Sequence, residues 1–214
     1  MHIEVLVEDR SGATLVETLM PRVICESHTW RVISYKGIGR IPKGMTGNSD
    51  PAKRALLDQL PRVLKGYGKT PYVDAVVVVV DSDHRDCKEF LAELKALTEQ
   101  CHPAPKTLFR LAIEEMEAWL LGDRKALQAA YPKAKMSTLA KYHQDSICNT
   151  WELLADAVYP GGYKAIRDAG YPECGRLKHE WAEKIARHMD VENNASHSFC
   201  KFRDGVRGLF SAGA

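Results

Sequence analysis

The pattern of hydrophobic and polar residues centres on five consecutive valines at residues 76–80, which leave no polar face. A β-branched run of this kind predicts a strand buried on both sides, as in a parallel sheet covered by helices. Residues 3–9, 30–36 and 107–113 predict three further strands. Apolar residues at helical spacing lie between them, such as Leu15 and Leu19. We therefore predict an α/β fold with a four-stranded, mainly parallel sheet flanked by helices.

The pattern changes from about Gly122, where short amphipathic segments are separated by proline and glycine. These segments predict helices, and we expect an α/β core over residues 1–121 with an α-helical extension over residues 122–214 packed on it. Within the core, Asp50 and Pro51 predict the start of a helix that Pro61 breaks or kinks.

Composition and charge limit the classes of protein to which this chain could belong. The chain has 214 residues, of which 27% are charged, and a net charge of +2, so it lacks the strongly basic character of proteins that coat DNA. The N-terminus MHIEVLVEDR has no apolar signal-peptide core, and no stretch approaches about 20 apolar residues. We expect a soluble cytoplasmic protein that does not bind membranes. Its six cysteines are scattered without a C-x-x-C pair, which predicts reduced thiols.

Acidic residues follow three of the four predicted strands. The carboxyl ends of parallel strands meet at one edge of a sheet, where open α/β folds bind their ligands. The acids there would be Glu8, Asp81, Asp83, Glu115 and Glu117. Surface solubility would scatter such residues, so their repetition at strand ends favours a functional site.

Asp81 and Asp83 are two residues apart, so in extended backbone both carboxylates project to the same side. Carboxylates this close repel unless a cation lies between them, and Mg²⁺ accepts such ligands while leaving positions open for phosphate oxygens. Asp-x-Asp after a strand is also a common turn and helix-cap signal, and Asp86 has the position of a cap.

A loop rich in glycine and positive charge follows the second predicted strand, and it contains Lys36, Arg40 and Lys43. The loop differs from a nucleotide-binding P-loop because Met45 stands where that motif requires lysine. Its basic residues could steer a polyanion, and a simply solvated loop is the alternative.

The phrases LVED, VVVDSD, IEEMEAWLLGD and MDVENNASHSF resemble a small bacterial family of uncharacterised TOPRIM-like proteins. Members are often encoded beside an ABC-type ATPase, are associated with phage defence, and are related to the overcoming-lysogenization nucleases. The resemblance covers nearly the whole chain and implies a Rossmann-like TOPRIM core. In this chain the TOPRIM glutamate would be Glu8, the Asp-x-Asp pair Asp81 and Asp83, and the extra acids Glu115 or Glu117. Asp9 replaces the glycine that usually follows the glutamate, either as an added ligand or as a helix cap.

The resemblance implies a metal-dependent nuclease that hydrolyses phosphodiesters of DNA or RNA. Mg²⁺ or Mn²⁺ would be held by Glu8, Asp81 and Asp83, and Glu115 and Glu117 could complete a two-ion site. The candidates for phosphate contacts are Lys36, Arg40, Lys43, His84 and Arg85. The expected partners are a nucleic acid and an ABC-type ATPase, and a homodimer stays open.

Two other classes of function stay open. The acids could bind a structural ion or a basic patch on an ATPase, in which case the chain would be a non-catalytic subunit. Alternatively, Asp81 could be the nucleophile of a small-molecule phosphatase or phosphotransferase. The second alternative fits less well, because Asp81 follows the third predicted strand rather than the first.

Overall fold

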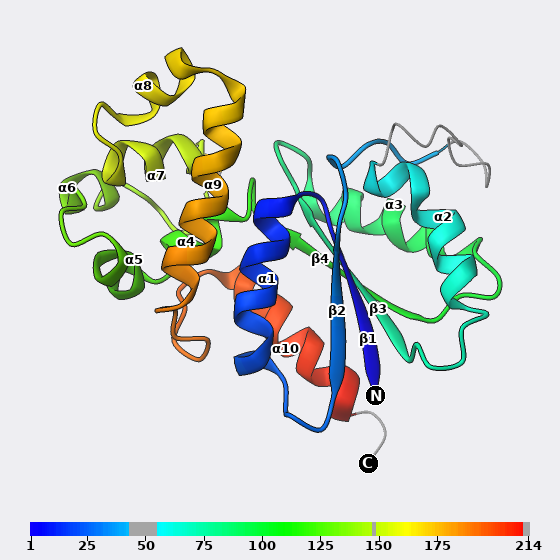
Figure 1. Ribbon diagram of the computed structural model, residues 1–214. Coiled ribbons are helices and arrows are strands. Elements are labelled where there is room, and N and C mark those ends of the chain that lie inside the picture. Colours follow the sequence, from blue (N-terminus) through cyan, green and yellow to red (C-terminus); the bar gives the residue numbers. More distant parts are fainter. Residues whose placement is uncertain (43–54, 147–148, 212–214) are drawn as a thin grey trace.

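The computed structural model describes residues 1–42, 55–146 and 149–211 (Figure 1). Four strands form one sheet: β1 (His2–Val7), β2 (Thr29–Ser34), β3 (Ala75–Asp81) and β4 (Lys106–Ala112). The strand order is β2-β1-β3-β4, and every neighbouring pair is parallel. The predicted α/β class and parallel sheet are therefore confirmed.

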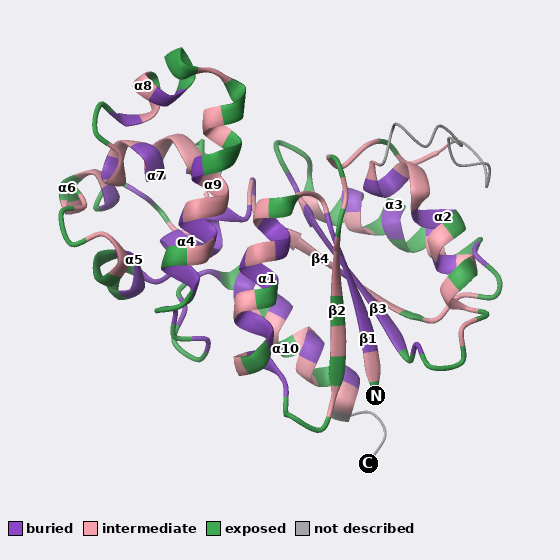
Figure 2. Cartoon of the chain, in the orientation of Figure 1, coloured by how far each residue is buried: buried purple, intermediate pink, exposed green. Residues whose placement is uncertain are grey.

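Helices cover both faces of the sheet, as the valine run predicted. Val77 and Val79 pack into a core shared with α1 (Arg10–Val23) and α10 (His197–Ser211). Val76, Val78 and Val80 pack on the other face of the sheet, into a second core with α2 (Leu56–Tyr67) and α3 (Cys87–Glu99). Figure 2 shows β3 buried along its length between these two layers.

The remaining helices lie beside the sheet, to the left in Figure 1. They are α4 (Glu117–Leu121), α5 (Arg124–Ala130), α6 (Met136–Leu139), α7 (Thr150–Val158), α8 (Gly162–Ala169) and α9 (Tyr171–Ala186). The longest of them, α9, packs along α1, and the chain then returns to the sheet as α10 beside β4. None of the described helices is long and apolar enough to span a membrane.

Two further expectations from the sequence concern Pro61 and the cysteines. We predicted that Pro61 breaks or kinks the helix; helix α2 continues through Pro61 to Tyr67, so this proline does not break it. Burial of Leu57, Leu60 and Leu64 against the sheet compensates for the hydrogen bond that proline cannot make. The predicted cap at Asp50 and Pro51 lies outside the described residues. The cysteines within the described residues are free thiols, as expected.

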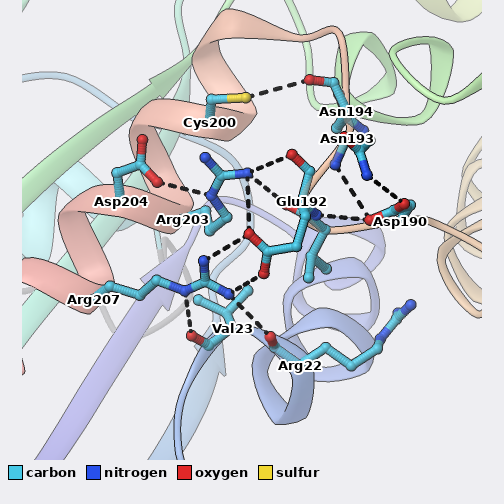
Figure 3. A network of polar contacts seen from close by, with 11 residues as sticks. Arg22, Val23, Asp190, Glu192, Asn193, Asn194, Cys200, Arg203, Asp204 and Arg207 are labelled. Carbon is cyan, nitrogen blue, oxygen red and sulfur yellow. Dashed lines mark hydrogen bonds and ion pairs between the residues drawn. The ribbon is translucent and has the colours of Figure 1, made fainter.

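A polar network holds the turn after α9, and α10, against the end of α1 (Figure 3). Arg22 donates to the carbonyl oxygen of Met189, just after α9, at 2.6 Å. Arg207 of α10 donates to the carbonyl oxygen of Val23 at 3.0 Å and pairs with Glu192 at 2.9 Å. Because these bonds join three elements, they set the direction in which α9 runs along α1.

A second network joins α4 to the start of α10. The indole nitrogen of Trp119 donates to the Ser198 hydroxyl at 3.0 Å, and the Asn194 side chain donates to the Trp119 carbonyl oxygen at 2.9 Å. Gly122 lies against this network, since a Cβ atom there would be 2.1 Å from Asn194 Oδ1. The segments EAWLLGD and ENNASHS are therefore complementary parts of one buried contact.

The close approach of Gly122 to Asn194 predicts that a larger residue at position 122 destabilises the protein. Gly122→Ala should lower the free energy of unfolding by about 1–3 kcal/mol, because the added methyl group overpacks the contact with Asn194. Gly208→Ala is the control, since Gly208 is exposed within α10 and nothing lies within 4 Å of an added Cβ atom. That change should instead stabilise the protein by about 0.5–1 kcal/mol. Urea unfolding of both variants checks the prediction, and equal effects would contradict it.

Candidate metal site at the carboxyl edge of the sheet

The predicted acids meet at one edge because the strands are parallel and closely in register. Val7 pairs with Val79 and Asp81 pairs with Ala112, so Glu8 and Asp81 end their strands at similar heights. After β4, Glu115 precedes α4 and Glu117 is its first residue. Each of these three carboxylates acts electrostatically on Asp81. The structure therefore brings Glu8, Asp81, Glu115 and Glu117 into one cluster, which we call the edge cluster.

Burial makes the negative charge of this cluster costly. The pKa of Asp81 is raised well above its ordinary value by burial and then by Glu8 and Glu117. Burial, with Asp83 and Asp9 nearby, raises the pKa of Glu8 to about 7. Burial also raises the pKa of Glu117 to about 7. The edge cluster consequently gains stability from any cation that enters it.

One cation is already supplied by the protein. The Nζ atom of Lys178, from α9, lies 3.0 Å from Glu115 and 3.6 Å from Glu117. Burial alone would lower the pKa of Lys178, but the charges of Glu117 and Glu115 raise it above its ordinary value. Lys178 therefore stays charged and neutralises part of the edge cluster.

Lys178 was not among the site residues expected from the sequence, although the sequence contains a signal for it. The apolar stripe of α9 contains Leu177, Trp181 and Ile185, all buried, and Lys178 falls on this stripe by its spacing. A lysine on an apolar stripe needs a buried partner of opposite charge. A hydrogen bond of 3.0 Å between Thr14 and His179 fastens this part of α9 to α1 beside the edge cluster.

The turns after β3 and β4 are joined by hydrogen bonds. The Glu114 backbone nitrogen donates to the Ser82 hydroxyl at 2.8 Å, and the Asp83 nitrogen donates to the Glu114 carbonyl oxygen at 2.9 Å. Asp83 and Glu114 both have left-handed backbone, with φ of 48° and 61°, which is uncommon for residues other than glycine. Local strain of this kind is often found at functional sites.

Asp83 lies further out than Asp81. It is exposed and pairs with Arg85 at 3.7 Å, while its charge still raises the pKa of Glu8. The two aspartates thus differ, because Asp81 is half-buried with its Oδ1 atom enclosed in the edge cluster, and Asp83 lies at the solvent side.

Two neighbouring acids act as helix caps. The Asp9 carboxylate accepts a hydrogen bond from the Gly12 nitrogen at 2.7 Å, so this residue caps α1. The Glu114 carboxylate accepts from the backbone nitrogens of Asn149 and Thr150 at 2.7 and 2.9 Å. Glu114 thereby holds the start of α7 beside the edge cluster.

The predicted phosphate contacts lie on the same edge. The Gly37 nitrogen donates to the Glu8 carbonyl oxygen at 3.0 Å, which places the loop with the exposed side chain of Lys36 beside the edge cluster. Arg40 is exposed further along this loop, and His84 and Arg85 are exposed after β3. Lys43 lies outside the described residues.

Three carboxylate oxygens in this region are buried without a hydrogen-bond partner: Glu8 Oε2, Asp81 Oδ1 and Glu115 Oε2. Oxygen donors of this type suit Mg²⁺ or Mn²⁺. Within the described residues, however, no group of three or more histidine, cysteine or acidic side chains is arranged so that it could hold a metal ion. The donor chemistry fits a divalent cation, and the side chains as they stand do not yet enclose one.

Comparison with known proteins gives a family. The model of a domain of unknown function, DUF4276, matches residues 7–207. The chain belongs to this DUF4276 family. No curated protein and no solved structure matches it. The matched range contains every residue of the edge cluster and Lys178.

The position of Lys178 predicts a large stability effect. Lys178→Met should lower the free energy of unfolding at pH 8 by about 3–5 kcal/mol, because it leaves buried carboxylates without their cation. Lys184→Met is the matched control on the same helix, where the lysine is exposed and pairs with Glu180. That change should cost less than about 1 kcal/mol. Denaturant unfolding measures both, and a small effect of Lys178→Met would contradict the buried pair.

The raised pKa of Glu8 predicts a pH-dependent effect of Glu8→Gln. A carboxyl group whose pKa is higher in the folded state favours folding at low pH, and that contribution is lost as pH rises through about 7. Glutamine has no such dependence, so without divalent cations Glu8→Gln should be more stable than wild type at pH 8. The difference should shrink at pH 5.

Thermal unfolding in EDTA at both pH values checks this, with about 2–4 °C expected for each kcal/mol. Glu26→Gln serves as control, because Glu26 is exposed before β2 at the opposite end of the sheet. A Glu8→Gln difference that is the same at both pH values would contradict the raised pKa.

Proposed function

We propose that this DUF4276 protein is a Mg²⁺- or Mn²⁺-dependent nuclease that hydrolyses phosphodiesters of DNA or RNA at the edge cluster. The observation that carries the proposal is the set of buried, unpaired oxygens on Glu8, Asp81 and Glu115, which have the donor chemistry of a divalent-cation site. Exposed Lys36, Arg40 and Arg85 on the same edge suit a polyanionic substrate.

Charge favours one metal ion over two. The four carboxylates of the edge cluster carry at most four negative charges, and Lys178 offsets one of them. Because Lys178 pairs with Glu117 and with Oε1 of Glu115, the groups left for an ion are Glu8, Asp81 and Oε2 of Glu115, with Asp83 at the solvent side. A second divalent ion at Glu115 and Glu117 would lie against the Lys178 ammonium group, which repels it.

When bound, a divalent cation supplies an acidified water and stabilises charge on the phosphate. Side chains of the protein would contact the substrate phosphates and position one another. Lys36, Arg40 and Arg85 would contact phosphates on either side of the scissile bond, and Asp83 would keep Arg85 turned toward the edge. Lys178 holds Glu115 and Glu117 in place.

We also propose that the site is TOPRIM-like and that the protein acts in defence against phage. The sequence of Glu8, then Asp81 and Asp83, at the ends of adjacent parallel strands supports a TOPRIM-like site. We include in the proposal a role in defence against phage together with an ABC-type ATPase partner, which rests on the resemblance of the family phrases.

Lys178 also favours a second candidate, a non-catalytic subunit, because the edge cluster carries a cation of its own. A phosphatase with Asp81 as nucleophile is less favoured. The pKa of Asp81 is raised by burial, and a protonated carboxyl group is a poor nucleophile.

The test compares cleavage of plasmid, single-stranded DNA and RNA by wild type, Glu8→Gln and Asp81→Asn, with Mg²⁺ or Mn²⁺. Both substitutions are near-isosteric and should reduce the cleavage rate at least about 100-fold. Glu26→Gln should keep wild-type activity, because Glu26 is at the opposite end of the sheet. Folding of each variant is confirmed by circular dichroism.

Calorimetric titration with Mn²⁺ separates the two candidates. Binding by wild type that both variants lose, together with cleavage, supports the nuclease. Binding without cleavage, repeated with the ATPase added, would favour the non-catalytic subunit. Absence of Mn²⁺ binding in wild type would overturn the metal site.

A further inference from the structure

A large cavity lies between α6, α7 and α8, beside the edge cluster. Its volume is about 760 Å³, which is within the range of small-molecule sites. Its lining includes Lys135, Lys141, Asn149, Glu152, Asp156 and Tyr163. The resemblance and the sequence motifs assign no role to these residues.

Helix α7 and the residue before it link the cavity to the candidate site. Asn149 lines the cavity, and its backbone nitrogen donates to Glu114, the residue before Glu115, at 2.7 Å. Glu152, one turn further along α7, also lines the cavity. Burial raises the pKa of Glu152, and the charges of Glu115 and Glu114 raise it further. A ligand in the cavity would therefore lie within electrostatic reach of the edge cluster.

The two lysines of the cavity are available for an anion. Lys135 and Lys141 are exposed, and neither forms an ion pair with another of the described residues. Phosphate groups are the anions that a nucleic-acid strand leaving the edge cluster would present.

The acidic residues of the lining suit the hydrogen-bond donors of a base. Glu152 Oε2 is buried and has no hydrogen-bond partner. Asp156 is less available, because it accepts a bond from the Tyr163 nitrogen at 2.8 Å. An ionised carboxylate accepts hydrogen bonds, and the pairing edges of cytosine, adenine and guanine carry N–H donors that can supply them. In a duplex these edges are occupied by base pairing, so the lining selects an unpaired base.

We infer that the cavity binds an unpaired nucleotide of the strand whose phosphodiester lies at the edge cluster, with its base toward Glu152 and its phosphates toward Lys135 and Lys141. This inference rests on the proposed function and specifies its substrate as single-stranded or unpaired nucleic acid. The half-buried ring of Tyr163 forms a further wall against the nucleotide.

Binding without cleavage tests the inference. Fluorescein-labelled single strands of RNA and DNA of about 15 nucleotides, and the matching duplex, are titrated with protein in Ca²⁺ and followed by anisotropy. The double variant Lys135→Ala, Lys141→Ala should weaken single-strand binding about tenfold or more. The control Lys133→Ala, Lys164→Ala removes two exposed lysines outside the cavity lining and should change it less than about twofold.

A second variant tests the contact between Glu152 and the base. Glu152→Gln keeps the shape but can donate as well as accept, so it should change the relative affinity for single strands made of one base type. Unchanged base preference would overturn the assignment of Glu152, and equal weakening by both double variants would overturn the cavity site. Free AMP or GMP that binds as tightly as the strands would identify a mononucleotide as the ligand instead.

The outcomes distinguish this inference from the proposed function. Cleavage by wild type with no effect of the cavity variants on strand binding would overturn the inference and keep the nuclease. Cavity-dependent binding of single strands without any cleavage would keep the inference and overturn the nuclease. Absence of single-strand binding by wild type would overturn the inference.

Discussion

Repulsion among carboxylates at one edge of the sheet is the constraint on which the rest of the structure depends. The parallel strands bring Glu8 and Asp81 to the same height, and the turn after β4 adds Glu115 and Glu117. Water cannot solvate these charges fully because they are buried, so the protein must supply a cation or keep protons on them. It supplies Lys178, and it leaves Glu8 and Asp81 with raised pKa values.

The helical part of the molecule places that lysine. Helix α9 is held to α1 near the edge cluster by Thr14 and His179, and at its far end by the bonds of Arg22 and the connection to α10. A long lysine side chain has many rotamers, and a fixed helix limits where its ammonium group can lie. Helix α9 lies beside the sheet, and through Lys178 it offsets part of the negative charge of the edge cluster.

The most distinctive phrases of the sequence turn out to have two different roles. EAWLLGD and ENNASHS contact each other through Trp119, Asn194 and Ser198, so these three residues stabilise the fold. Glu117, the first residue of EAWLLGD, belongs to the edge cluster. Short acidic motifs at the strand ends carry the candidate chemistry. A segment can therefore be specific to a family because it packs against another segment, and its specificity alone does not indicate a functional site.

The sequence by itself determined the α/β class, the buried valine strand and the gathering of acids at one edge, because these depend on local hydrophobic periodicity and on the geometry of parallel strands. It also contained the cap at Asp86, whose carboxylate accepts from the first backbone nitrogens of α3. The tertiary structure alone decided that Glu114 caps α7, that Asp83 lies outside Asp81, and that Lys178 enters the edge cluster. These facts depend on contacts between residues far apart in the chain, such as Glu115 and Lys178, and local sequence patterns carry no information on how distant segments pack together.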